Sequence, residues 1–289
     1  MAQLLVDGAI SGVVIALLAA GFAVVYLPTR IFHVALGGIY VIAPLIAWTV
    51  LRYQWSWPVA IAASLISGIV LGLACEALNH SWLARKPGAE GAHLISSLGL
   101  YMVFSEAAAL VWGNETKSIR MGLDRVWEIG PVVVTGAQAS AAAAASLMLA
   151  TFYIWLRWTG LGLTFRALAS NPTEIALRGY SLQRLRFIAF GLSGLFGATA
   201  AILNSMDLGF GPRGGLVVLF LAVVASIVGG RESFAGPVLG GLLVGILRAE
   251  IAWFTSTRWQ DAAVFLLLAL VLAARPGGVL GTTKRVEAL

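Results

Sequence analysis

The run LLVDGAISGVVIALLAAGFAVVYL, residues 4–27, decides the fold class of this chain. Asp7 is its only charged residue and stands near the start. A helix that crosses a bilayer needs roughly 20 predominantly apolar residues, so the run predicts a membrane-spanning helix. No Lys or Arg precedes it, as the basic start of a secretory signal would require, so we expect no cleaved signal peptide.

Similar runs follow along most of the chain and predict about eight or nine spans in one transmembrane domain, 1–289. The further runs are 31–51, 58–83, 92–112, 132–156, 185–206, 214–229, 236–254 and 260–274. Run 31–51 contains Gly37, Gly38 and Pro44, and run 214–229 is short. Either fits a broken or re-entrant segment, which is tolerated only where protein or a water-filled cavity covers its backbone. The expected fold is an all-α, polytopic transmembrane helical bundle.

The composition excludes an ordinary soluble domain. Of the 289 residues, 60% are hydrophobic and 11% charged, whereas soluble domains average about 45–50% and about 25%. A net charge of +6 would point to nucleic acid in a soluble protein, but basic cytoplasmic loops explain it here, so we expect no nucleic-acid partner. One cysteine, Cys75, excludes an internal disulfide, and no two histidines are four residues apart, so we expect no metal site.

The basic residues predict which side of the membrane each connection faces. Connection 157–186 holds five arginines and one acid, Glu174, which marks it as cytoplasmic. We expect the C-terminal tail on the same side, together with Arg85 and Lys86. The tail is basic through Lys284 and Arg285. Connection 113–131, whose charges balance, then faces outward with the N-terminus.

The cytoplasmic connection contains the pattern of a short, capped helix. Asn171 suits the N-cap, and Pro172 suits the first helical position, where a missing N–H is no loss. Glu174 is placed so that its carboxylate can reach back to the N-cap N–H. Gly179 suits the left-handed residue that ends a helix, and Ser181 can cap the next one.

A helix of about two turns is marginal in water, so contacts must hold this one. Two interpretations have even odds on physical grounds alone. The helix is either a loop element resting on its own bundle or a surface element that inserts into a groove of a cytoplasmic partner.

A family resemblance favours the second interpretation. The stretch TGLGLTFRALASNPTEIALRG, residues 159–179, resembles the cytoplasmic loop of permease subunits of branched-chain amino acid ABC transporters, the LivH/LivM-like family. Three further stretches are similar to motifs of that family in the expected order. They are RIFHVALGGIY at 30–40, GFGPRGG at 209–215 with VGGRESFAGPVLGGLLVG at 228–245, and RPGGVLG at 275–281.

The resemblance implies a permease subunit of the bacterial inner membrane, with no catalytic residue and no cofactor of its own. It implies two cytoplasmic ATP-binding subunits that use the ATP, a second permease that is LivM-like or identical, and an extracytoplasmic solute-binding protein. Loop 159–184 would be the cytoplasmic coupling loop, with contacts to the ATPase from Arg166, Ala169, Asn171, Glu174, Ala176, Arg178 and Gly179. The translocation path or the helix packing around it would involve His33, Gly37, Gly38, Gly229, Gly230, Gly236, Gly240 and Gly241.

The sequence also departs from the family pattern. His33, Leu36 and Gly38 stand where the family has Asn, His and Glu, and Arg231 and Glu232 replace small residues. The substrate is therefore either a branched-chain amino acid or a related small amino acid or amide solute. A stand-alone secondary transporter or channel is the alternative function, and an intramembrane enzyme is a second rival.

Few ionisable residues fall inside the predicted spans, and buried charges in a membrane are functional suspects. We expect Glu76 to have a structural partner inside the bundle. For Glu250 we expect an ion pair at the outer rim with Arg248 or Arg258. His33 follows a basic turn, and we expect it to be a satisfied histidine at the membrane surface in preference to a proton relay.

Small residues recur at four-residue spacing in two of the runs. Gly236 and Gly240, then Gly241 and Gly245, lie one turn apart on adjoining faces of a predicted helix. Gly8 is placed likewise in the first run, four residues before another glycine. This spacing lets helix backbones approach closely, so we expect packing seams there.

Overall fold

The computed structural model describes residues 1–86, 90–119, 122, 125–230 and 232–281. The predictions that concern Arg231, Lys284 and Arg285 lie outside the described residues.

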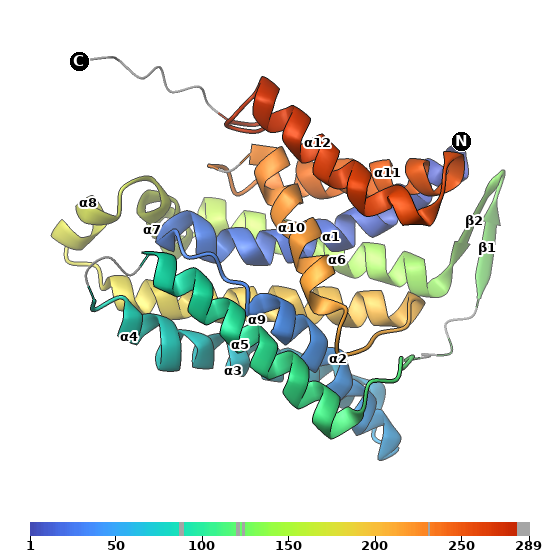
Figure 1. Ribbon diagram of the computed structural model, residues 1–289, viewed down its shortest axis with the longest axis horizontal. Coiled ribbons are helices and arrows are strands. Elements are labelled where there is room, and N and C mark those ends of the chain that lie inside the picture. Colours follow the sequence, from blue (N-terminus) through green and yellow to red (C-terminus); the bar gives the residue numbers. More distant parts are fainter. Residues whose placement is uncertain (87–89, 120–121, 123–124, 231, 282–289) are drawn as a thin grey trace.

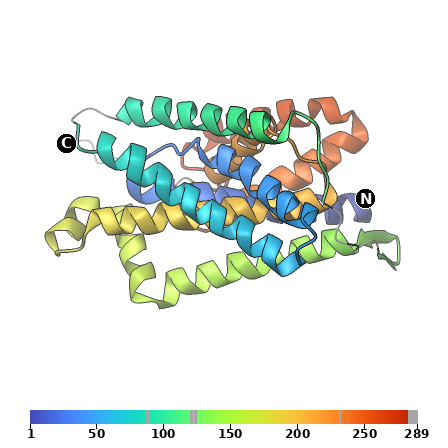
Figure 2. The same cartoon turned by 90° about the horizontal axis from the view of Figure 1, so that it is seen from below.

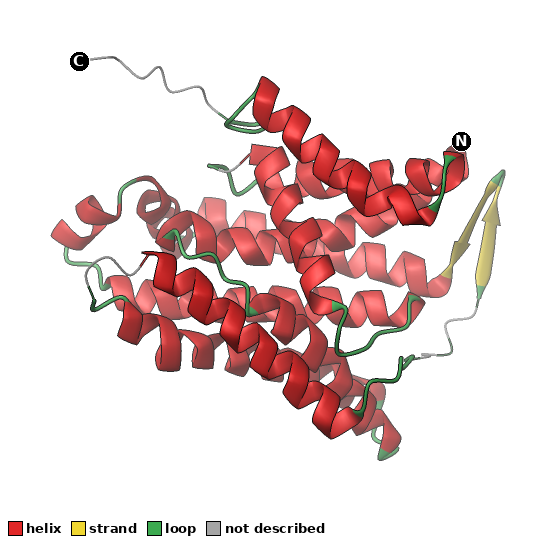
Figure 3. Ribbon diagram, viewed as in Figure 1, coloured by secondary structure: helices red, strands yellow, loops and turns green. Residues whose placement is uncertain are grey.

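Helices make up almost all of the described chain (Figure 3). The α-helices are α1 Ala2–Thr29, α2 Leu36–Arg52, α3 Trp57–Cys75, α4 Ser81–Leu83, α5 Glu90–Trp112, α6 Gly136–Trp158, α7 Gly160–Ser170, α8 Pro172–Leu177, α9 Leu182–Asp207, α10 Gly215–Gly230, α11 Gly236–Phe254 and α12 Gln260–Ala274. A π-helical turn, η1 Glu76–His80, joins α3 to α4, and a 3-10 turn, η2 Thr257–Trp259, precedes α12.

Seven helical stretches in the described residues are long and apolar enough to cross a membrane. The two shorter apolar helices are α2 and α10, which arise from the two runs that the sequence marks as irregular. The all-α polytopic bundle is therefore confirmed. Helix α2 begins only at Leu36, and the non-helical residues before it are mostly buried in protein, as backbone at membrane depth must be.

The long helices run roughly along the longest axis of the molecule, which gives it two distinct ends (Figures 1 and 2). Helices α7 and α8 lie at one end, here named the α8 end. The N-terminus and a β-hairpin lie at the other, here named the hairpin end. Helix α1 is at the centre, packed against α11, α9, α10 and α6. In contrast, α12 is largely exposed along its apolar length, as a lipid-facing helix would be.

The hairpin differs from the prediction that run 132–156 is helical throughout. Strands β1 Val126–Ile129 and β2 Val132–Thr135 pair antiparallel, and α6 begins only at Gly136. Three successive valines favour a strand, and Thr135 then caps α6 by accepting a hydrogen bond from the N–H of Gln138 at 3.2 Å. Gln3 ties the hairpin to α1 with two hydrogen bonds to the backbone of Val133, at 2.9 and 2.7 Å.

The predicted glycine seams are confirmed as helix contacts. Gly12 faces the backbone of α11 at Gly241 and Leu242, and Gly240 faces the carbonyl of Ala225 in α10. The sequence analysis missed a third seam, in which Gly68 and its helix α3 meet the backbone of α9. Because side chains larger than hydrogen do not fit at these positions, the seams fix how closely the helices approach.

Candidate functional site

The segment that joins α6 to α9 is built from successive helix caps. Thr159 begins α7 by accepting a hydrogen bond from the N–H of Gly162 at 3.0 Å. Asn171 ends α7 and caps α8, accepting from the N–H of Glu174 at 3.2 Å. Gly179 adopts the left-handed conformation, with φ of 83°, and Ser181 caps α9. The predicted short helix is therefore confirmed. So are its N-cap at Asn171, the left-handed residue at Gly179 and the cap of the next helix at Ser181.

The prediction that the Glu174 carboxylate accepts a hydrogen bond from the N–H of the N-cap residue, Asn171, is wrong. The N–H of Asn171 already donates to the carbonyl of Ala167, at 2.9 Å, because α7 continues to Ser170 without a break. The Glu174 carboxylate instead pairs with the Arg178 guanidinium at 2.5 Å, one turn further along α8. Both side chains are exposed, so the pair adds little to stability and leaves its charges on the surface.

Helix α8 offers nearly all of its surface to solvent. Ile175 is its one buried residue, at 6% exposure, whereas Leu177 is 83% exposed. Of the residues predicted to couple to a partner, Asn171, Glu174, Ala176, Arg178 and Gly179 lie together on and around α8 and are exposed. Arg166 and Ala169 lie on α7 instead, where both line a pocket.

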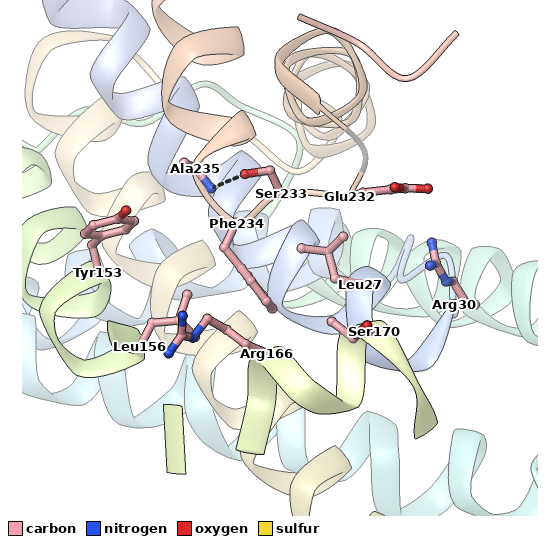
Figure 4. Close-up of a pocket in the computed structure, with 11 residues that line it drawn as sticks. Leu27, Arg30, Tyr153, Leu156, Arg166, Ser170, Glu232, Ser233, Phe234 and Ala235 are labelled. Carbon is pink, nitrogen blue, oxygen red and sulfur yellow. Dashed lines mark hydrogen bonds between the residues drawn. The ribbon is translucent and has the colours of Figure 1, made fainter. Parts of the chain in front are cut away.

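This pocket is a half-open hollow of about 340 Å³ at the α8 end (Figure 4). The ends of α1 and α6, helix α7 and the link between α10 and α11 enclose it. Arg166 and Tyr153 lie on one side of Phe234, and Arg30 and Glu232 on the other. Among the described residues, none of its charged side chains forms an ion pair. The sequence analysis missed this pocket because its walls come from three distant parts of the chain.

The glycines predicted to line a path or pack helices all lie at close contacts in this structure. Gly37 faces the carbonyl of Gly215, and Gly38 faces the ring of Phe104. The remaining members are Gly229, Gly230, Gly236, Gly240 and Gly241, at contacts among α1, α10, α11 and residues 278–281. Such contacts explain by packing alone why glycine is needed at these positions. That these glycines line a translocation path stays a prediction.

The RPGGVLG motif has a structural role at the same end. The N–H groups of Val279 and Leu280 donate to the carbonyls of Val228 and Gly229, at 2.8 and 2.9 Å. The motif thereby satisfies carbonyls that the last turn of α10 leaves free.

The prediction for His33 is wrong. Its side chain is fully buried, and neither ring nitrogen has a hydrogen-bond partner among the described residues. The reason is that residues 31–35 fold into the bundle and do not lie on its surface. His80 and His93 are buried beside it, and the Nδ1 atoms of that pair are 3.1 Å apart. No sequence spacing could have shown this, since the three histidines come from three separate segments.

One prediction for the buried acids is confirmed and one is wrong. Glu76 is fully buried and accepts two hydrogen bonds from the Arg186 guanidinium, at 2.7 and 3.1 Å. Arg248 pairs with Asp261 at 2.5 Å, and no ion pair of Glu250 occurs among the described residues. The turn at η2 brings the first turn of α12 back beside Arg248, which favours Asp261 as its partner. Within the described part of the chain, no group of three or more metal-ligating side chains is arranged to hold an ion.

Comparison with known proteins agrees with these features. Residues 4–274 match the family described as "Branched-chain amino acid transport system / permease component". The chain is 25% identical to the high-affinity branched-chain amino acid transport system permease protein LivH of Salmonella typhimurium, over 96% of this chain and 95% of that protein. It is 29% identical to the corresponding protein BraD of Pseudomonas aeruginosa, with the same coverage.

A relative named for another solute matches as well. The autoinducer 2 import system permease protein LsrC of Escherichia coli is 27% identical, over 92% of this chain and 77% of that protein. No solved structure matches the chain. The family match extends over all the spanning helices, so the chain belongs to the family of permease components of branched-chain amino acid transport systems and is a multi-pass membrane transport subunit, not an enzyme.

Proposed function

We propose that this chain is the membrane-spanning subunit of an ATP-driven importer, and that α8 is the element on which an ATPase subunit docks. Two cytoplasmic ATPase subunits, a second permease that is identical or LivM-like, and an extracytoplasmic binding protein complete the assembly. The α8 end then faces the cytoplasm of a bacterial cell, and the hairpin end faces outward.

The exposure of α8 is the observation that carries this proposal. A helix of six residues is too short to be stable alone, and here one buried side chain, Ile175, and the caps at both ends hold it. Its outer face combines the exposed apolar Leu177 and Tyr180 with the charged pair of Glu174 and Arg178. Exposed apolar and aromatic side chains next to charged ones are typical of protein interfaces.

The short connection from α8 to α9 supports a mechanical role. Helix α9 begins at Leu182 and continues through the buried centre of the bundle, where it packs on α1, α2 and α3. A displacement of α8 by a docked partner is therefore passed to a helix that four of the other apolar helices contact, namely α1, α2, α3 and α6.

We further propose that the cargo is a branched-chain amino acid or a related small amino acid or amide solute, delivered by the binding protein. The relatives LivH and BraD are named for branched-chain amino acids, and LsrC for autoinducer 2. Since the family includes proteins named for different solutes, the polar residues missing from the 30–40 motif favour a specialised cargo.

The test of docking replaces the exposed pair on α8. In the complex purified with its ATPase subunits, E174A/R178A should reduce the stimulation of ATP hydrolysis by loaded binding protein by several fold. R248A/D261A, which removes the ion pair at the hairpin end, is the matched control and should retain stimulation. Unchanged stimulation in E174A/R178A, with the complex intact by gel filtration, would exclude α8 as the docking element.

A further inference from the structure

All three histidines of the chain meet in one buried cluster. His33 comes from the link between α1 and α2, His80 from η1 and His93 from α5. The rings of His33 and His80 are 5.8 Å apart and nearly perpendicular, and those of His80 and His93 are 5.3 Å apart. Phe190 of α9 contacts both His33 and His80, with ring centroids at 4.7 and 5.0 Å. Four segments that are distant in sequence therefore share one polar centre.

The bond between His80 and His93 requires at least one of the two rings to be neutral. Their Nδ1 atoms are 3.1 Å apart, so one ring donates its Nδ1–H and the other accepts with a bare Nδ1. A protonated imidazole carries hydrogen on both nitrogens and can only donate. If both rings are protonated, two N–H groups face each other and the bond is lost.

The other polar groups around the cluster disfavour a buried positive charge. Glu76, one turn before His80 in η1, is already paired with Arg186 of α9 through two hydrogen bonds. The described charged and titratable groups that face the rings from each packed segment are therefore the other histidines, this neutralised acid and the Arg186 guanidinium. No unpaired carboxylate among them could stabilise an imidazolium.

Several buried polar atoms of the cluster have no partner among the described residues. They are both ring nitrogens of His33 and Nε2 of His80. Buried polar atoms without partners raise the free energy of the closed bundle. Access of water to this region would remove that cost. A π-helical turn, a feature often found at functional sites, forms one of its walls.

We propose that this histidine cluster is a proton-binding site that acts as a latch. With neutral rings, the hydrogen bond between His80 and His93 holds η1 against the start of α5. Below about pH 6.5, where a hydrated imidazole takes up a proton, the protonated form is stable only when the cluster opens to water. The closed form is therefore favoured above that pH and is lost as the pH falls.

Opening of the latch would act on the α8 end of the bundle. Arg186 and Phe190, which pack against the cluster, lie within about 12 Å of the start of α9 along its axis. Four residues separate the end of helix α8 from that start. Acidification would consequently loosen the part of α9 on which α8 is mounted.

The only cysteine of the chain reports on the latch. Cys75 is buried and directly precedes Glu76 of η1. The purified full-length chain in lipid nanodiscs is labelled at Cys75 with an aromatic disulfide, a reagent that reacts with thiols in acid, at pH values from 8 to 5. Each rate is divided by that of an unstructured cysteine peptide at the same pH, which removes the intrinsic titration of the thiol.

The wild-type rate should be flat above about pH 6.5 and then rise by at least about tenfold for each pH unit below it, because opening exposes buried neutral imidazoles and takes up at least one proton. In H93N the introduced amide oxygen accepts from His80 even when His80 is protonated, and one titrating ring is gone, so the rise should be clearly less steep. H80N should behave in the same way and serves if H93N does not fold. E250Q, which alters an acid near the hairpin end, should retain the wild-type profile.

Three results would overturn the proposal. They are a wild-type rate that does not change with pH, a wild-type chain that stays unlabelled down to pH 5, and an acid-induced rise that persists unchanged in the histidine variants. None of these readouts involves the ATPase or the cargo, so the latch can fail while the transport function stands.

Discussion

At the scale of single residues, the closest helix contact rests on the absence of one side chain. A Cβ atom added to Gly240 of α11 would overlap the carbonyl of Ala225 and the backbone of Gly229 in α10. We predict that G240V separates these two helices and lowers the free energy of unfolding by at least about 1–3 kcal/mol, the usual cost of overpacking. The measurement is the thermal unfolding of the purified chain in detergent.

The matched control is a glycine in a helix with open space around it. A Cβ atom at Gly99 of α5 meets nothing within 4 Å. G99A should therefore be neutral or stabilising by about 0.5–1 kcal/mol, because alanine loses less backbone entropy than glycine in a helix. Equal destabilisation by G240V and G99A would show that the seam between α10 and α11 is not closely packed.

Residue spacing predicts which face of a helix is used for close packing. It does not identify the distant segment that packs against that face. The four-residue glycine repeats point to packing seams because both glycines lie on one helix. Glu76 was expected to have a partner because of its depth, yet nothing in the sequence identifies Arg186, which is 110 residues away. The His80–His93 bond and the pocket around Phe234 were missed for the same reason, since only the folded bundle brings their walls together.

At the scale of elements, α8 depends on its caps. Asn171 is the residue that satisfies the first N–H groups of α8, and loss of such a cap costs about 1 kcal/mol. We predict that N171A populates frayed forms of α8 and, if α8 docks the ATPase as proposed, weakens the stimulation of ATP hydrolysis by about fivefold. Titration of ATPase activity against loaded binding protein measures this.

The control for the cap retains its chemistry. N171D keeps an oxygen acceptor at the N-cap, so it should preserve most of the stimulation. If N171A and N171D lose activity equally, the amide of Asn171 contacts the partner directly, and the cap is not the source of the effect. If neither loses activity, α8 does not need to be helical for coupling.

Local signals predicted this element well and its neighbours less well. Asn, Pro and Gly at fixed positions define α8, because caps depend on residues close in sequence. The hairpin was missed because Val132–Thr135 is apolar and continues directly into the run of α6, so hydropathy alone joins a strand to a helix. The prediction of a hydrogen bond from the Asn171 N–H to the Glu174 carboxylate was wrong because α7 runs directly into α8 and already uses that N–H group.

At the scale of the whole molecule, composition and the order of the apolar runs predicted the bundle. Burial within it followed no sequence signal. The apolar runs of α1 and α12 are both strongly hydrophobic, yet the spanning window of α1 is 67% buried and that of α12 is 6% buried. Helix α12 therefore faces outward, although its apolar run resembles those of the buried helices. Its outer face is thus available to lipid or to the second permease.

The arrangement of the two ends predicts an orientation that can be tested with the cysteine content of the chain. With C75A as background, V126C on β1 and L177C on α8 each place one thiol at an opposite end. Val126 is 51% exposed and Leu177 is 83% exposed, so both thiols are accessible. Because connection 157–186 is strongly basic, the positive-inside rule places the α8 end in the cytoplasm. In intact spheroplasts, a membrane-impermeant maleimide should label V126C and leave L177C unlabelled.

Permeabilisation should then make L177C reactive, which shows that its thiol was protected by the membrane and not by the fold. The reverse pattern would place α8 outside, beyond the reach of any cytoplasmic ATPase, and would contradict both the orientation and the proposed docking.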